Sequence, residues 1–231
     1  ASVEGRTLEP GYAWLRIRAF QERTDEDVQR ELKKIAGENP AGLRGLVLDL
    51  RDNPGGLLNQ AVEVADHWLD EGLIVYTQGR DASQRQDYPA RRDGGEPGYP
   101  IVVLVNAGSA SASEIVAGAL QDHARALVLG LPTFGKGLVQ SVFRIDQTTA
   151  LKLTTARWYT PSGRTIQRTA SDERDQVMQA MAAADNGGVV PDSVLHARGD
   201  SLGLPEFKTD DGRIVLGGGG IVPDLIVRQD S

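Results

Sequence analysis

Short, mostly apolar runs alternate with helical spacing in the middle of the chain, and this alternation restricts the possible folds more than any other feature. Residues 46–50 (LVLDL) and 101–105 (IVVLV) are typical of buried strands. Residues 57–70 and 111–124 repeat apolar side chains at intervals of three and four residues, which is typical of a helix. The strand–helix–strand order, which continues to a strand at 126–129, therefore predicts an α/β fold.

The flanking segments add elements of both kinds. A helix is predicted at 24–36, because Thr24 precedes acidic residues that suit a first turn. The further strands are predicted at 12–20, 73–77, 138–145, 150–159 and 225–228. Three stretches have no clear element: 1–11 is polar and irregular, 78–100 is a long surface loop that could hold an edge hairpin, and 168–212 is an insertion or arm with a helix-like piece at 171–184.

The composition argues against several classes of partner and of catalytic group. The net charge of −7 over 231 residues argues against nucleic acid and anionic membranes as main partners. The chain has no cysteine, which excludes disulfides and thiol nucleophiles, and its only histidines are His67, His123 and His196. His67 and His123 fall inside helical patterns, so we expect them to be satisfied or surface histidines rather than catalytic bases.

A serine-rich turn between the strand at 101–105 and the next helix is the first candidate site. The helix N-terminus there favours developing negative charge, and small neighbours leave room for a substrate carbonyl. The residues alone do not choose among Ser109, Ser111 and Ser113 as nucleophile. Ser111 also begins a capping-box pattern with Glu114, so a purely structural role as helix cap is an open alternative.

A lysine between two glycines is the second candidate. Lys136 lies in the turn Thr133-Phe-Gly-Lys-Gly137, where the backbone can approach another element closely. A lysine that acts as a base must be neutral, and a nearby amide can orient it without adding charge. Gln140 is four residues further on and could face the same side. An exposed loop lysine is the alternative interpretation.

A glycine turn after the strand at 46–50 is the third candidate. Backbone N–H groups at Gly55 and Gly56 could point at an oxyanion, although a plain tight turn before a helix would look the same. Asp49 and Asp52 lie nearby, but no further carboxylate or histidine cluster accompanies them to suggest a metal site.

Together these segments resemble the carboxyl-terminal processing peptidases, or tail-specific proteases, a family of serine peptidases. The resemblance covers about residues 8–167 and 217–227. It rests on four motifs in matching order: LVLDLRDNPGG at 46–56, GSASASEI at 108–115, TFGKGLVQ at 133–140 and YTPSGRTIQ at 159–167.

The resemblance implies a crotonase-like (ClpP/crotonase) α/β serine peptidase core built from strand–strand–helix units. It implies Ser111 as the nucleophile, Lys136 as its base 25 residues later, and Gln140 as the residue that orients the lysine. Ala112 and one glycine of the Gly55–Gly56 pair match the oxyanion donors. No cofactor or metal is implied.

The resemblance also carries expectations about organisation and partners. We expect residues 1–231 to be the catalytic core, without the PDZ domain that family members usually carry before the strand at 12–20. The implied substrates are unfolded or flexible protein tails with apolar C-terminal residues, in an extracytoplasmic, bacterial periplasmic or membrane-associated setting. A homo-oligomer or an adaptor protein is a further expected partner.

Two alternatives stay open at this point. The same fold could serve a crotonase-like acyl-CoA enzyme, which would use the oxyanion hole without pairing Ser111 and Lys136. The chain could also be a non-catalytic peptide-binding core in which Ser111 is only a helix cap.

Overall fold

The computed structural model describes residues 2–91, 95–96, 98–168, 199–200 and 203–227. Its principal sheet has six strands in the order β1-β2-β3-β6-β7-β12, and only β1 is antiparallel to its neighbour. The strands of this sheet are β1 Val3–Glu9, β2 Tyr12–Ile17, β3 Gly45–Asp49, β6 Ile101–Val105, β7 Ala126–Gly130 and β12 Leu225–Ile226.

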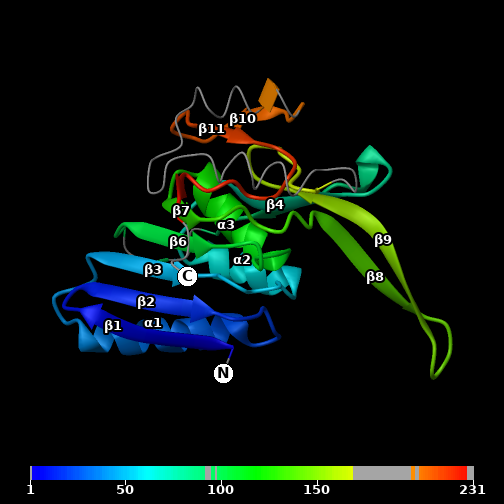
Figure 1. The fold of residues 1–231 in the computed structure, drawn as a ribbon. Coiled ribbons are helices and arrows are strands. Elements are labelled where there is room, and N and C mark those ends of the chain that lie inside the picture. The colour runs from blue at the N-terminus through cyan, green and yellow to red at the C-terminus, as the bar shows by residue number, and fades with distance from the viewer. Residues whose placement is uncertain (1, 92–94, 97, 169–198, 201–202, 228–231) are drawn as a thin grey trace.

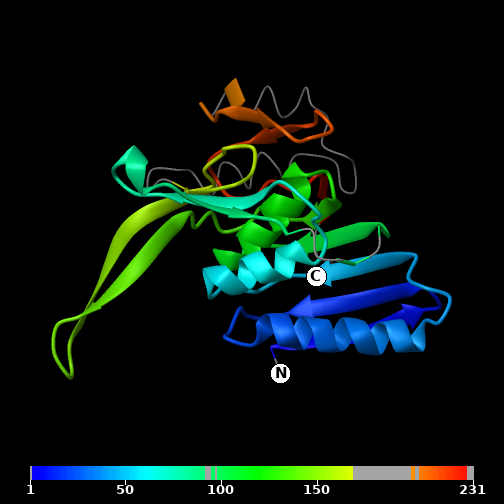
Figure 2. The same ribbon diagram turned by 180° about the vertical axis from the view of Figure 1, so that it is seen from behind.

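Three helices pack on one face of this sheet, as Figure 2 shows. They are α1 Thr24–Glu38, α2 Leu58–Asp66 and α3 Ala112–Asp122. The α3 helix is buried along its whole length, because it lies between the principal sheet and a second sheet. The mixed α/β class that the sequence predicts is confirmed.

The second sheet has four antiparallel strands in the order β5-β4-β9-β8. These are β4 Leu73–Gln78, β5 Gln86–Pro89, β8 Leu138–Arg144 and β9 Ala150–Tyr159, with a short 3₁₀ turn at Ala82–Gln84. Inside the loop predicted at 78–100, β5 pairs with the preceding strand β4, so an edge hairpin forms but only its second strand lies within that loop. The β8–β9 hairpin projects from the body as a long ribbon (Figure 1).

The expectation that residues 1–11 are irregular is wrong, because β1 pairs with β2 from Val3 to Glu9. The sequence hides this strand because glycine occupies an inward position. A side chain at Gly5 would lie 3.0 Å from the terminal methyl of Ile35 on α1, so helix and strand approach closely there. An alternation of apolar residues is therefore absent although the strand is half buried.

Most predicted boundaries differ from the observed ones by a few residues. The strand predicted at 12–20 ends at Ile17, and Phe20 forms only an isolated bridge with Gly56. The helix predicted at 57–70 ends at Asp66.

The arm predicted at 168–212 falls largely outside the described residues, as does its helix-like piece at 171–184. Its described part includes β10 Glu206–Lys208, which pairs with β11 Ile214–Leu216.

Candidate active site

The structure distinguishes Ser111 from its neighbouring serines. Ser109 and Ser113 are fully buried, and their hydroxyls donate to the carbonyl oxygens of Leu50 and Asn53 at 2.8 and 2.9 Å. Ser111 is half-buried and lies at the N-cap of α3, directly after the turn that leaves β6. Of the three serines, Ser111 is therefore the one in a position to meet a substrate.

The backbone of Ser111 is strained, with φ 56° and ψ −114°. A helix cap does not require this conformation, because N-cap residues normally have extended dihedrals. A non-glycine residue in such a sparsely populated region costs on the order of 1–3 kcal/mol. Ser111 also forms the predicted capping box with Glu114, so the cap exists, but it does not account for the strain. Strained turns between a strand and a helix are typical of exposed serine nucleophiles.

The glycine turn after β3 lies against the Ser111 turn. A side chain on Gly55, whose φ is +95°, would be 2.5 Å from the carbonyl oxygen of Ala110 and 2.8 Å from the nitrogen of Ala112. The close packing of the two turns therefore requires glycine at position 55, since any larger residue would separate them. Gly56 is equally constrained, because a Cβ there would be 2.0 Å from the carbonyl oxygen of Phe20.

The hydrogen bonds differ between the two glycines. The Gly55 N–H donates to the Asn53 side chain at 2.9 Å. Within the described part of the chain, the Gly56 N–H has no such partner, and neither has the N–H of Ala112, the first amide of α3. Unpaired amides at a helix N-terminus and a glycine turn can hold an anionic oxygen. Gly56 and Ala112 are thus the available donors.

Asn53 joins the two turns and was not singled out from the sequence. Its buried side chain donates to the Ile17 carbonyl at 2.8 Å and accepts from Gly55. Its carbonyl accepts from the Ala110 N–H and the Ser113 hydroxyl, both at 2.9 Å. An asparagine before Pro-Gly-Gly looks like an ordinary turn residue, so the sequence carries no signal of this role.

Glu114 connects the Ser111 turn to the lysine turn. Its Oε2 accepts from the backbone N–H groups of Ser111 and Lys136 at 2.7 and 2.9 Å. Its Oε1 accepts from the Thr133 hydroxyl at 2.5 Å and the Gly135 N–H at 2.7 Å. Burial raises the pKa of Glu114, and these four donors act in the opposite direction. The sequence indicated Glu114 only as part of a cap.

The lysine turn is also held from the second sheet. The indole N–H of Trp158 on β9 donates to the Lys136 carbonyl at 3.1 Å, and Lys136 is half-buried. Gln140 is exposed on β8, where the register with β9 shifts between Val139 and Gln140. Among the described contacts, no hydrogen bond joins Gln140 to Lys136, and its orienting role stays a prediction.

The remaining candidates have structural partners. Asp49 is buried and accepts two bonds from the Arg51 guanidinium at 2.9 and 2.7 Å. His67 contacts Asp25 at 2.7 Å. In the part of the chain that is described, no group of three or more acidic or histidine side chains could hold a metal ion, and no helix is long and apolar enough to cross a membrane.

His123 contacts Asp210 through Nδ1 and the Leu73 carbonyl through Nε2, both at 2.7 Å. The expectation of satisfied histidines is therefore confirmed for His67 and His123, whereas His196 lies outside the described residues.

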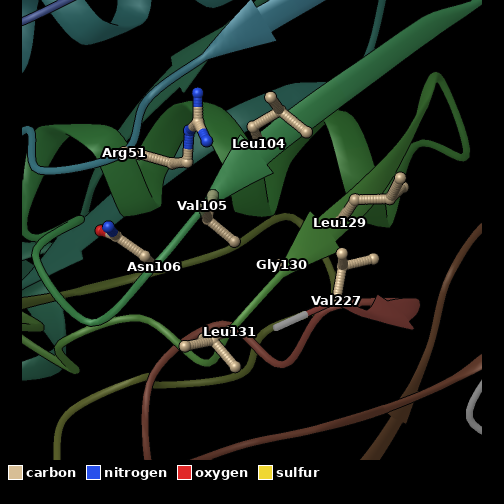
Figure 3. Close-up of a pocket in the computed structure, with 8 residues that line it drawn as sticks. All are labelled: Arg51, Leu104, Val105, Asn106, Leu129, Gly130, Leu131 and Val227. Atoms are coloured by element: carbon tan, nitrogen blue, oxygen red, sulfur yellow. The ribbon is translucent and has the colours of Figure 1, made fainter. Parts of the chain in front are cut away.

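A small apolar pocket of about 150 Å³ lies at the carboxyl ends of β6 and β7, as Figure 3 shows. Its lining residues are Arg51, Leu104, Val105, Asn106, Leu129, Gly130, Leu131 and Val227. The Asn106 side chain also binds Asp52 and the Gly108 N–H at 2.8 and 3.0 Å. Asn106 thereby connects the wall of the pocket to the turn that leads to Ser111.

The site combines a half-exposed serine in a strained turn, free amides beside it, and a lysine turn that is bound to the same carboxylate as the serine turn. These are the components of a serine acyl-transfer site. Comparison with known families agrees with this class. Residues 11–175 match the model of peptidase family S41, and the chain belongs to that family.

Curated relatives are carboxyl-terminal processing proteases. The chain is 49% identical over 161 residues to the carboxy-terminal-processing protease of Bartonella bacilliformis, a match that covers 69% of this chain and 37% of that protein. It is 41% identical over 155 residues to the carboxyl-terminal-processing protease of Synechocystis, which covers 67% of this chain and 35% of the relative. The chain thus spans little more than a third of these relatives.

A solved structure, the photosystem II D1 C-terminal processing protease, has a TM-score of 0.62 and 35% identity to this chain. The match covers 71% of this chain and 45% of the other.

Proposed function

We propose that this chain is the catalytic part of a serine endopeptidase of the carboxyl-terminal processing type, on a crotonase-like core. Ser111 is its nucleophile and Lys136 its general base. The observation that carries the proposal is the Glu114 carboxylate, which holds the backbones of both residues on one oxygen atom. A helix cap alone would not require the lysine turn to be fixed to the same atom.

The reaction follows from these roles. Neutral Lys136 accepts the Ser111 hydroxyl proton as Oγ attacks a peptide carbonyl, and the amides of Gly56 and Ala112 stabilise the oxyanion. Lys136 then gives the proton to the leaving amine. Water hydrolyses the acyl-enzyme, and the same lysine serves again as base. Every group in this scheme belongs to the chain, and no cofactor takes part.

The features of the β8–β9 ribbon favour a flexible polypeptide as the substrate. Phe143 pairs with Leu151 and Ser141 with Leu153, so these side chains share one face of the ribbon. The three apolar side chains are 44–49% exposed. The ribbon begins two residues after Lys136, and β8 is an edge strand of its sheet. Extended peptides commonly add to such an edge.

An extracytoplasmic location, in the periplasm for a bacterial protein, is part of the same proposal. It is supported by the family resemblance, and curated relatives include a chloroplastic carboxyl-terminal-processing peptidase of Arabidopsis thaliana. A PDZ domain, a homo-oligomer and an adaptor protein are likewise proposed partners of the complete protein.

A fluorophosphonate probe with intact-mass detection tests the proposal. We expect one adduct on the wild-type protein, no adduct on Ser111→Ala, and hydrolysis of an unfolded polypeptide by the wild type alone. An acyl-CoA enzyme would instead turn over thioesters without needing Ser111. Peptide binding without turnover or adduct would favour the non-catalytic alternative.

A further inference from the structure

The motif at residues 159–167 contains a glutamine for which the catalytic scheme so far gives no role. Gln167 accepts the Gly137 N–H through Oε1 at 2.9 Å and donates from Nε2 to the Arg168 carbonyl at 2.6 Å. The second bond fixes the orientation of the amide, so that its oxygen faces the peptide that joins Lys136 to Gly137.

The glycines on both sides of the lysine allow this contact. A Cβ on Gly137 would lie 3.0 Å from the backbone nitrogen of Gln167, and a Cβ on Gly135 would lie 3.0 Å from the Arg168 Cβ. The Arg168 N–H also donates to the Gly135 carbonyl at 3.0 Å. Residues 167–168 therefore bind the chain immediately before and after Lys136, in addition to the bond from the Lys136 N–H to Glu114.

The contacts made by Glu114 and by Gln167 with the lysine turn differ in charge. Glu114 on α3 binds this turn with a carboxylate, whereas the Arg168 guanidinium donates to the carbonyls of Thr133 and Gly219. Gln167 supplies a hydrogen-bond acceptor without a formal charge. A carboxylate in its place would favour the protonated, cationic form of the nearby lysine, which cannot act as a base.

We propose that Gln167 is a positioning residue for the base. It holds the Lys136–Gly137 peptide through a neutral acceptor, which keeps the lysine aimed while leaving it free to lose its proton. This inference rests on the proposed function of Lys136 and adds a residue whose effect passes through Lys136 rather than through contact with the substrate.

Two substitutions of Gln167 distinguish the effect of positioning Lys136 from the effect of charge near it. Gln167→Met keeps the length but removes the acceptor, and we expect kcat to fall about 10- to 100-fold with little change in KM, because a small misplacement of a catalytic group has an effect of this size. Gln167→Glu keeps the acceptor for the Gly137 N–H and adds a charge, but it also loses the bond to the Arg168 carbonyl, as Gln167→Met does. We expect the acid limb of its pH–rate profile to move up by about one pH unit, with much of the activity recovered at high pH.

Gln147→Met and Gln147→Glu, at the exposed tip of the ribbon, are matched controls that should leave both quantities unchanged. The inference is overturned if Gln167→Glu keeps the wild-type profile, or if Gln167→Met keeps the wild-type kcat. It is also overturned if both variants lose activity only in proportion to folded protein, measured by thermal melting. A wild type that hydrolyses no polypeptide would instead overturn the proposed function and this inference with it.

Discussion

The backbone N–H groups of Ser111 and Lys136 donate to the same atom, Oε2 of Glu114, at 2.7 and 2.9 Å. This shared acceptor fixes the separation of the turn after β6 and the turn that connects β7 of the principal sheet to β8 of the second sheet. Because Glu114 is fully buried, the bonds are protected from competition with water. The proposed nucleophile and base are thus positioned through hydrogen bonds of their main chains.

Ser111→Ala and Ser111→Gly separate catalysis from capping. Either change removes the proposed nucleophile and should lower the hydrolysis rate by at least about 10³-fold. Loss of the cap costs about 1 kcal/mol in the alanine variant, whereas glycine relieves the positive φ and should melt at or above the wild-type temperature. Peptide hydrolysis and thermal melting check both effects. Near-normal turnover in Ser111→Ala would mean that the residue is only a cap.

Lys136→Arg should be as inactive as Lys136→Met. Arginine keeps the positive charge but does not lose its proton in proteins, so it cannot act as a base. Lys152→Arg, on the exposed ribbon, is the matched control and should retain wild-type kcat/KM. Substantial hydrolysis by Lys136→Arg would show that residue 136 acts as a fixed charge rather than as a proton acceptor.

Glu114→Gln tests the shared acceptor with almost no change in shape. Each carboxylate oxygen accepts two donors, so the amide NH₂ must face two other donors and two hydrogen bonds are lost. We expect a loss of about 3 kcal/mol in the free energy of unfolding and a fall in kcat. The exposed Glu9→Gln is the control. If denaturant unfolding and kcat of Glu114→Gln both match the wild type, the shared acceptor contributes neither to stability nor to catalysis.

The Asp49–Arg51 pair should make stability depend on acid. Burial by itself would raise the pKa of Asp49, but the bonds from Arg51 outweigh it and hold that pKa below its ordinary value. The native state therefore binds this proton less readily than the unfolded state. The stabilisation is present above the ordinary carboxyl pKa and is lost as the pH falls through the native-state pKa.

Asp49→Asn should remove this dependence, and the exposed Asp70→Asn should not. Urea unfolding from pH 6 down to pH 3 measures both variants. Parallel curves for Asp49→Asn and the wild type would contradict the assignment.

The ribbon should contribute to binding of long substrates. Replacing Phe143 and Leu151 with serine removes the apolar pair and should raise KM for an unfolded polypeptide about tenfold, at unchanged kcat, as expected for two half-exposed apolar side chains. A short peptide should be unaffected. Val142→Ser, which changes the opposite face, is the control. If the double variant instead changes only the oligomeric state in size-exclusion chromatography, the face is a contact between copies.

The sequence by itself determined the class of the fold and the elements with strong periodicity. The run at 101–105 and the spacing of the helix after it specify β6 and α3, because burial on both faces and an apolar helix stripe leave a local signature. The four motifs also sufficed to indicate the family. In contrast, β1 left no such signature, since Gly5 faces Ile35 where an apolar side chain would otherwise mark the strand.

Only the tertiary structure decided which serine is available and what holds the site together. Ser109 and Ser113 look equivalent to Ser111 in the sequence, and they differ because their hydroxyls bond to carbonyls of a distant turn. Glu114 and Gln167 likewise acquire their roles from partners 22 and 30 residues away. Hydrogen bonds between segments so far apart depend on how sheets and helix pack, and residue spacing along the chain does not encode that packing.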